Sequence, residues 1–171
     1  MKQLTHYDIE NTQQNFPITI VCDAIRTPEN IGMCFRISES FGVAKIFLHE
    51  DSPSTENRKV VNTARNTLEQ IQYEIYTDFE ETIQQLKKEG NTIIGIEITD
   101  KSINIQDFNF SSEEKIVLLL GSERNGIENI DLVDATVAIP MYGRNSSMNV
   151  IHSLSIALYE VTNQLTKKKL K

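Results

Sequence analysis

The stretch Asn145–Glu160, NSSMNVIHSLSIALYE, begins with small polar residues and continues as an apolar repeat. Ser146 or Ser147 is a candidate N-cap, so we expect a long C-terminal helix from Ser146 onward. The position of Asn149 needs a further explanation, because inside a helix an Asn side chain competes for the hydrogen bonds of the backbone. The segment is therefore either a helix with an imperfect start or a helix whose start is a binding site. Its apolar residues recur at helical spacing and predict one core-facing side: Val150, Ile151, Leu154, Leu158, Val161 and Leu165.

The composition is that of a globular protein. The chain has 171 residues, 39% of them hydrophobic, and a formal net charge of -7, which suits one domain with a full core. No apolar run approaches the ~18 residues of a membrane span. Cys22 and Cys34 are the only cysteines and lack metal-ligand spacing, so we expect free thiols in a reducing cytoplasm and no metal site. The acidic balance argues against binding nucleic acid through overall charge, but not against a local basic patch.

Strand and helix patterns alternate along the chain. Helical patterns lie at 28–41, roughly 55–67 and 78–88, and Thr27, Pro28 and Glu29 form a strong helix start. The alternation predicts an α/β fold with a mostly parallel six-stranded sheet and helices on both faces. The predicted strands are β-branched, mostly apolar and bounded by turn residues: 16–23, 43–50, 71–76, 91–99, 115–121 and 135–141.

Three segments that follow predicted strands have the composition of ligand sites, which in open α/β sheets lie beyond the carboxyl ends of the strands. The first, DAIRTPENIGMCFRISESFG (23–42), lacks GxGxxG and is not an ordinary dinucleotide loop. Its Gly32 and Arg36 share a helix face, so the glycine leaves space for a guanidinium that suits phosphate. The alternative is a surface arginine beside a mild helix defect.

The second segment is LLLGSERNGI (118–127). Gly121 and Gly126 bracket a tight turn that brings backbone close to a ligand, and Glu123 places a carboxylate at the sheet edge. An ordinary turn whose acid favours the following helix N-terminus explains the same residues equally well.

The third segment, VAIPMYGRNSSMN (137–149), leads into the C-terminal helix. Pro140 is expected to end the strand ladder and Gly143 to permit a sharp turn. Ser147 and Asn149 offer short hydrogen-bonding groups. Each segment alone is a weak signal, whereas the three in this order are specific.

The order of three motifs resembles that of the SpoU/TrmH family of RNA ribose methyltransferases, within the SPOUT superfamily. The motifs are NIG with Arg36 (30–36), GSERNG (121–126), and IPM followed by SMNV (139–150). The resemblance covers most of the chain. It implies an α/β fold with a C-terminal trefoil knot, a homodimer, and methyl transfer from S-adenosyl-L-methionine to a ribose 2′-hydroxyl of RNA. We expect residues 1–16 to be a short N-terminal extension and residues 17–171 to be a single SPOUT methyltransferase domain.

The resemblance also implies roles for individual residues. Arg36 is the expected group that positions or activates the ribose hydroxyl, and the other expected catalytic residues organise it and the RNA phosphate: Asn30, Glu123, Ser147 and Asn149. The expected cofactor-binding residues are Gly95, Glu97, Gly121, Ile139, Met141 and Met148.

Basic residues give candidate RNA contacts besides Arg36. Arg58, Lys59 and Arg65 lie on a predicted helix that suits a phosphate track, although a solvated face is the simpler alternative. Arg124 stands where the family commonly has a smaller residue, and we expect it to add an RNA contact.

These residues favour an RNA 2′-O-methyltransferase that acts on tRNA. The N-terminal extension is the only expected addition to the domain, which favours a compact tRNA loop over ribosomal RNA. The alternatives are the same chemistry on ribosomal RNA, a flavodoxin-like nucleotide-binding module without catalysis, and an RNA binder that keeps the fold without activity.

Overall fold

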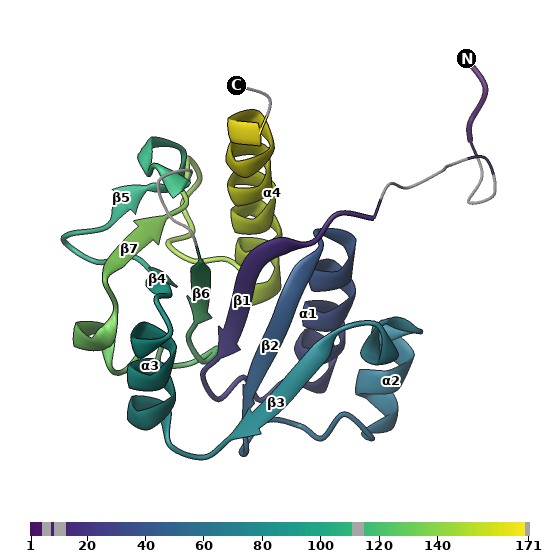
Figure 1. The fold of residues 1–171 in the computed structure, drawn as a ribbon, viewed down its shortest axis with the longest axis horizontal. Coiled ribbons are helices and arrows are strands. Elements are labelled where there is room, and N and C mark those ends of the chain that lie inside the picture. Colours follow the sequence, from purple (N-terminus) through teal and green to yellow (C-terminus); the bar gives the residue numbers. More distant parts are fainter. Residues whose placement is uncertain (5–7, 9–12, 111–114, 170–171) are drawn as a thin grey trace.

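Seven parallel strands form one sheet through the molecule (Figure 1). The computed structural model describes residues 1–4, 8, 13–110 and 115–169. The sheet has the order β3-β2-β1-β6-β4-β7-β5, and every neighbouring pair is parallel. The strands are β1 Phe16–Cys22, β2 Val43–His49, β3 Gln72–Tyr76, β4 Thr92–Ile96, β5 Ile103–Asn104, β6 Ile116–Leu120 and β7 Ala135–Ala138.

The predicted parallel α/β sheet is confirmed, but the predicted number of six strands is wrong. The additional strand, β5, has only two residues, and Ile103 pairs with Val137 of β7. Two residues at a sheet edge are too short to show a period of two in the sequence. β7 ends at Ala138, two residues before Pro140, as the missing proline N–H predicts.

The described residues form four α-helices. Three of them connect strands, α1 Pro28–Ser40, α2 Arg58–Ala64 and α3 Phe79–Lys88, and α4 Val150–Lys169 follows the last strand. Short 3-10 turns lie at Thr67–Glu69, Ile105–Asp107 and Ile130–Leu132. The predicted start of α1 at Pro28 is confirmed. α2 is shorter than its pattern predicts, because the Asn57 side chain caps it by accepting a hydrogen bond from the Lys59 amide at 2.9 Å.

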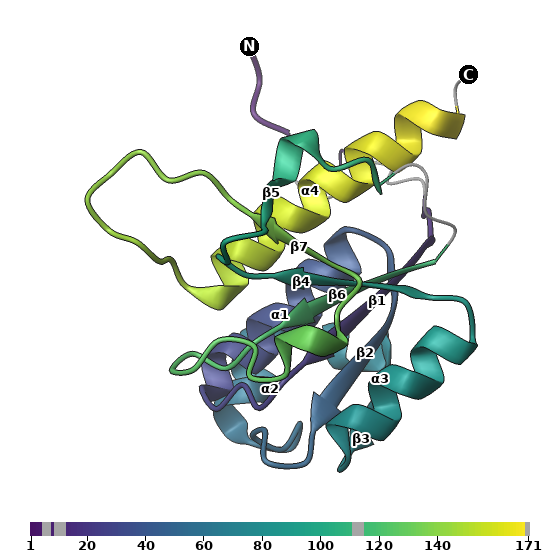
Figure 2. The ribbon, with the colours of Figure 1, turned by 90° about the vertical axis from the view of Figure 1, so that its left-hand side faces the viewer.

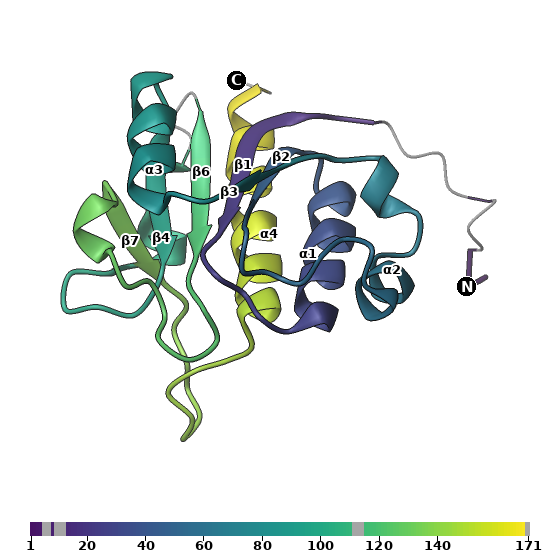
Figure 3. The same ribbon diagram turned by 90° about the horizontal axis from the view of Figure 1, so that it is seen from below.

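The helices cover both faces of the sheet, as predicted (Figure 1, Figure 3). Alternate residues of β1 face opposite sides. Ile18 and Ile20 enter a core with residues of α1, α2 and α4, whereas Val21 enters a second core with Ile83 and Leu86 of α3.

The start of α4 corrects the sequence prediction. The helix begins at Val150 instead of Ser146, and the Asn149 side chain accepts a hydrogen bond from the Ile151 amide at 2.8 Å. Asn149 is thus the capping residue, which explains an asparagine here without placing it inside the helix. Ser146 and Ser147 belong to a loop that projects from the body of the molecule before α4 (Figure 2).

Gly32 has a different role from the one its spacing to Arg36 predicts. A Cβ at Gly32 would lie 2.6 Å from the Val60 carbonyl oxygen and 2.8 Å from Thr63 Cβ, so α2 fills the space beside this glycine. The glycine therefore permits close packing of α1 on α2, and it leaves no room for the guanidinium of Arg36, which is exposed.

Two sequence predictions reach outside the described residues. These are parts of the N-terminal extension, at 5–7 and 9–12, and the end of the predicted domain, at 170–171. Within the described part of the chain, no helix combines the length and apolar character needed to cross a membrane.

Candidate active site

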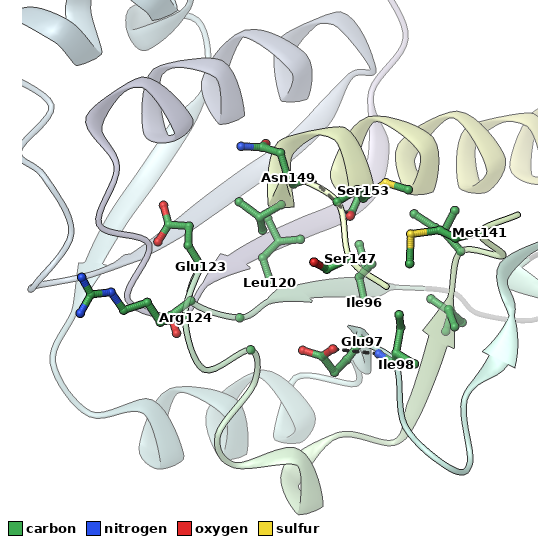
Figure 4. Close-up of a pocket in the computed structure, with 18 residues that line it drawn as sticks. Ile96, Glu97, Ile98, Leu120, Glu123, Arg124, Met141, Ser147, Asn149 and Ser153 are labelled. Atoms are coloured by element: carbon green, nitrogen blue, oxygen red, sulfur yellow. Dashed lines mark hydrogen bonds between the residues drawn. The ribbon is translucent and has the colours of Figure 1, made fainter. Parts of the chain in front are cut away.

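A cavity of about 380 Å³ lies at the carboxyl ends of β6, β4 and β7, which are neighbours in the sheet. Its walls come from the segments that follow these three strands and from the first turn of α4 (Figure 4). In this view Glu123 and Arg124 lie at one end, Met141 lies at the other, and Ser147 lies between them. The volume is within the usual range of small-molecule sites.

Glu123 caps α1 from another part of the chain. Its carboxylate accepts hydrogen bonds from the amides of Arg26 and Thr27, both at 3.0 Å, and from Asn30 Nδ2 at 2.9 Å. Thr27 is the N-cap residue by position, yet its hydroxyl makes no capping hydrogen bond. The helix start read from the sequence is thus completed by a carboxylate nearly a hundred residues away.

These hydrogen bonds change the acidity of Glu123. Partial burial raises its pKa, but the hydrogen bonds from the Arg26 amide, the Asn30 side chain and Thr27 outweigh burial and lower the pKa to about 2. The carboxylate is therefore charged at neutral pH, and its negative charge lies at the N-terminus of α1.

The lowered pKa predicts an acid-sensitive contribution to stability. Because the folded-state pKa lies below the ordinary value of 4.5, the contribution is complete above that value and is lost as the pH falls towards about 2. We expect Glu123→Gln to reduce the free energy of unfolding by about 1 kcal/mol at pH 7, a small value because water screens this partly exposed group. The difference should shrink as the pH falls from 4.5 to 3, measured by urea unfolding.

Glu56→Gln, at an exposed position, serves as the control and should change stability by less than about 0.5 kcal/mol. A difference between the parent protein and Glu123→Gln that is the same at pH 3 and pH 7 would contradict the assignment.

Asn30 joins Glu123 to the start of α4. Its Nδ2 donates to Glu123, and its Oδ1 accepts a hydrogen bond from Asn149 Nδ2 at 3.2 Å. The Asn149 side chain in turn caps α4 through the Ile151 amide. We call these three side chains the Glu123–Asn30–Asn149 network. It links three segments that are far apart in the sequence, and Asn30 is its most buried member, with 8% exposure.

Glu97 places a second carboxylate on the cavity wall. Its Oε1 accepts a hydrogen bond from the Ile98 amide at 2.8 Å, and its Oε2 accepts one from the Ile127 amide at 3.3 Å. Gly126 has a positive φ of 65°, and a Cβ there would lie 2.3 Å from Glu97 Oε2. Glycine at 126 therefore lets the carboxylate contact the turn.

The turn after β6 closes on itself. The amides and carbonyls of Ser122 and Gly126 exchange two hydrogen bonds, at 3.0 and 3.1 Å. A Cβ at Gly121 would lie only 2.1 to 2.4 Å from the backbone of Gly126 and Ile127. The two glycines thus shape the backbone that forms one wall of the cavity.

This geometry predicts a large effect of Gly121→Ala. The methyl group would force the 121–127 turn away from β6, and we expect a loss of about 3 kcal/mol in the free energy of unfolding, the upper end of the usual overpacking range. Urea unfolding measures this loss. Gly143→Ala is the control because, apart from Gly143 and its two chain neighbours, no described residue has an atom within 4 Å of the position of the added methyl group. A similar loss in both variants would refute the explanation.

The structure brings most of the predicted site residues together. Of the predicted cofactor-binding residues, five line the cavity: Glu97, Gly121, Ile139, Met141 and Met148. Gly95 does not line it. A Cβ added at Gly95 would lie 2.9 Å from Cδ1 of Ile127, so the Ile127 side chain packs against this glycine. Of the predicted catalytic residues, Glu123, Ser147 and Asn149 line the cavity, and Asn30 is joined to it through the network.

The predicted RNA contacts divide into two groups. Arg124 lines the cavity. Arg36 is exposed on α1 and is not among the lining residues, and its Cα lies about 9 Å along the helix axis from Asn30 at the usual rise per residue. Arg58 and Lys59 are exposed on α2, and Arg65 directly follows that helix. Lys59 pairs with Glu29 in the first turn of α1 at 3.0 Å, which holds this basic face beside α1.

Sequence reasoning missed several residues of the site. The amides of Arg26 and Thr27 bind Glu123, and no side-chain pattern reveals a backbone donor. Leu120 and Ser153 line the cavity, although their patterns predict only a strand and a helix. The helix start at Thr27 was a visible signal, because it showed amides in need of an acceptor.

The sequence comparison with known families decides the relationship. The model of the "SpoU rRNA Methylase family" matches residues 17–159. The chain belongs to this family. The resemblance inferred from the three motifs is thereby confirmed, and the matched region includes all the residues that line the cavity.

Individual SpoU relatives have low sequence identity to this chain. The chain is 29% identical over 168 residues to the 23S rRNA (guanosine-2′-O-)-methyltransferase RlmB of Neisseria meningitidis serogroup B, covering 95% of this chain and 66% of that protein. A second RlmB, of Ralstonia nicotianae, is 26% identical, covering 86% of this chain and 59% of that protein. The chain thus spans less than two thirds of the length of these relatives.

Solved structures of SpoU proteins share the fold. The methyltransferase AviRb of Streptomyces viridochromogenes in complex with the cofactor AdoMet has a TM-score of 0.80 at 23% identity, covering 91% of this chain and 63% of that one. A structure titled "Structural insights into the 2-OH methylation of C/U34 on tRNA" has a TM-score of 0.78 at 21% identity, covering 88% of this chain and 97% of that one.

Proposed function

We propose that this SpoU protein is an RNA methyltransferase that transfers a methyl group from S-adenosyl-L-methionine to a ribose 2′-hydroxyl. The observation that carries the proposal is that the second and third family motifs line one cavity, and that the Glu123–Asn30–Asn149 network joins the first motif to them. The name of the family, the names of the RlmB relatives and the AviRb complex with AdoMet support the same reaction.

The cavity suits this cofactor. Apolar side chains, including Ile96, Ile139 and Met141, give a surface for an adenine ring, and the Glu97 carboxylate offers acceptors for ribose hydroxyls or a partner for a sulfonium charge. Glu97, Gly121, Ile139, Met141 and Met148 are the proposed cofactor-binding residues. When bound, the cofactor supplies an electrophilic methyl group.

The polar residues at the other end of the cavity are proposed to hold the ribose. Glu123 fixes the N-terminus of α1, and with it the amide group of Asn30, so the network is ordered before substrate binds. Ser147 and Asn149 both line the cavity. We propose that they and Asn30 orient the ribose and its phosphate while the hydroxyl proton passes to water or phosphate.

Arg36 is proposed to bind the RNA phosphate beside the reacting ribose. A guanidinium group is a poor proton acceptor but a good phosphate ligand, because its planar set of N–H donors matches two phosphate oxygens. The exposed position of Arg36 outside the cavity agrees with contact to the RNA chain. Arg124 at the cavity and the α2 residues Arg58, Lys59 and Arg65 are proposed as further phosphate contacts.

Two classes of RNA are the candidate substrates. The sequence relatives with 23S rRNA in their names favour ribosomal RNA. The tRNA substrate predicted from the sequence is supported by a structural neighbour whose title concerns tRNA and whose chain is matched over 97% of its length.

We also propose a homodimer with a C-terminal trefoil knot, located in the cytoplasm.

One experiment tests the activity and the RNA class together. Purified protein is incubated with S-adenosyl-L-methionine carrying a labelled methyl group and with total tRNA or ribosomal RNA that lacks the modification. We expect label in one RNA class and binding of the cofactor in calorimetry. Binding of FMN instead, with no label in either RNA, would favour the flavodoxin-like nucleotide-binding module and overturn the proposal.

A further inference from the structure

The segment from Ile139 to Asn149 forms a loop that projects from the body of the molecule. It leaves the sheet after β7 and returns at the start of α4, and two views at right angles to the first show it extending outward (Figure 2, Figure 3). Both ends of the loop line the cavity, through Ile139 and Met141 on one side and Ser147 and Met148 on the other. The two ends of the loop therefore border the cavity, and its middle, residues 142–146, extends outward from them.

Tyr142 in this loop is 94% exposed. Among the large hydrophobic side chains of the described residues, only the terminal Met1 is more exposed. Within the part of the chain that the structure describes, no hydrogen bond from residues 142–146 reaches another segment, and no atom lies within 4 Å of the Cβ position of Gly143. Packing within this chain thus gives no reason for an aromatic residue at this position.

The charges near the cavity and along the loop favour a polyanion. Arg144 is exposed two residues after Tyr142 in the loop, and Arg124 is exposed at the end of the cavity opposite Met141 (Figure 4). The loop, IPMYGRNSSMN, has no acidic residue, although the whole chain has a net charge of -7. An exposed aromatic ring near an arginine and small polar residues is typical of surfaces that bind single-stranded nucleic acid, where bases stack on the ring and guanidinium groups bind phosphate.

A subunit interface is a poorer explanation of the same residues. Stable interfaces have a contiguous apolar centre, whereas the neighbours of Tyr142 in the loop are Gly143, Arg144, Asn145 and Ser146, all exposed. Tyr142 also directly follows Met141, a lining residue, so the two Cα atoms lie about 3.8 Å apart. The backbone of Tyr142 therefore borders the cavity lining, and its exposed ring is free to contact RNA that extends out of the cavity.

We propose that Tyr142 stacks on an unpaired base next to the methylated nucleotide and that Arg144 binds the phosphate between them. This inference rests on the proposed function, because it names how the same site holds its RNA. It adds an aromatic stacking contact to a site whose other polar groups are amides, hydroxyls and carboxylates.

The test compares Tyr142→Ala, Tyr142→Leu and Tyr142→Phe in binding to whichever of total tRNA or ribosomal RNA the parent protein methylates. We expect the affinity for RNA to fall about 5- to 100-fold with alanine and with leucine, which lacks a π-face, and to stay within about 2-fold with phenylalanine. The affinity for S-adenosyl-L-methionine should be unchanged in all three. Arg144→Ala should weaken RNA binding and reduce the slope of log affinity against log salt concentration by about one.

Each other outcome has a distinct meaning. Equal RNA binding by the parent protein and Tyr142→Ala, with the parent still methylating RNA, overturns the stacking contact alone. A halved mass of Tyr142→Ala in light scattering shows that the ring is a subunit contact, which also overturns it. Failure of the parent protein to methylate either RNA overturns the proposed function and this inference with it.

Discussion

Asn30→Ala is expected to lower the rate of methyl transfer at least about 100-fold, the usual effect of removing one preorganised polar group from an active site. The variant loses the donor to Glu123 and the acceptor for Asn149 at once, so the start of α1 and the start of α4 are no longer joined. The affinity for S-adenosyl-L-methionine should change little, because Asn30 is not among the residues that line the cavity. Turnover on RNA and cofactor calorimetry measure the two quantities.

Two further variants make this prediction specific. Asn30→Asp keeps the shape of the side chain but places a carboxylate against Glu123, so it should be at least as impaired as the alanine variant. Asn62→Ala, on the exposed side of α2, is the control and should retain full turnover. Near-normal turnover of Asn30→Ala would show that the network is structural and has no role in the reaction.

Arg36→Ala is expected to lower kcat/KM for RNA about 100-fold without changing the affinity for the cofactor. The exposed guanidinium is proposed to grip a phosphate with two parallel hydrogen bonds, a geometry that an ammonium group cannot reproduce. Arg36→Lys should therefore fall almost as far as the alanine variant. Lys88→Ala, at the end of α3 on the other face of the sheet, is the charge-matched control.

The lysine variant carries the decisive information about Arg36. Near-normal turnover of Arg36→Lys would show that a positive charge is sufficient and that planar recognition of phosphate is not needed. A loss in kcat at saturating RNA, with KM unchanged, would instead assign Arg36 to the reacting atoms.

Most of the fold follows from patterns within single segments. The runs that became β1 and β6 are mostly apolar and β-branched, and they pair with each other inside the sheet, where such runs are stable. β5 could not be predicted, because its two residues are held by β7 and not by their own pattern. The predicted start of α4 is too early, because Ser146, Ser147 and Asn149 all have side chains that can cap a helix, and only the path of the loop selects Asn149.

The candidate site depends on contacts between segments, and this limits what the sequence predicts. The three motif segments were identified individually, and parallel strands bring their ends to one edge. The sequence did not reveal that Glu123 caps α1, since the helix start at Thr27 shows amides that need an acceptor but no residue pattern shows which side chain supplies it. The prediction for Gly32 was wrong for a similar reason. Val60 and Thr63 of α2 fill the space beside this glycine, and residue spacing within one helix does not show which neighbouring element packs against it.

The position of the transferred methyl group tests the central claim most directly. RNA that has been incubated with the protein and S-adenosyl-L-methionine is hydrolysed in alkali, which cleaves a phosphodiester only where the neighbouring 2′-hydroxyl is free. We expect an alkali-resistant dinucleotide whose mass includes one additional methyl group, formed by the parent protein and nearly absent with Asn30→Ala. Methyl groups found only on bases, in mononucleotides released by alkali, would contradict ribose 2′-O-methylation by this cavity.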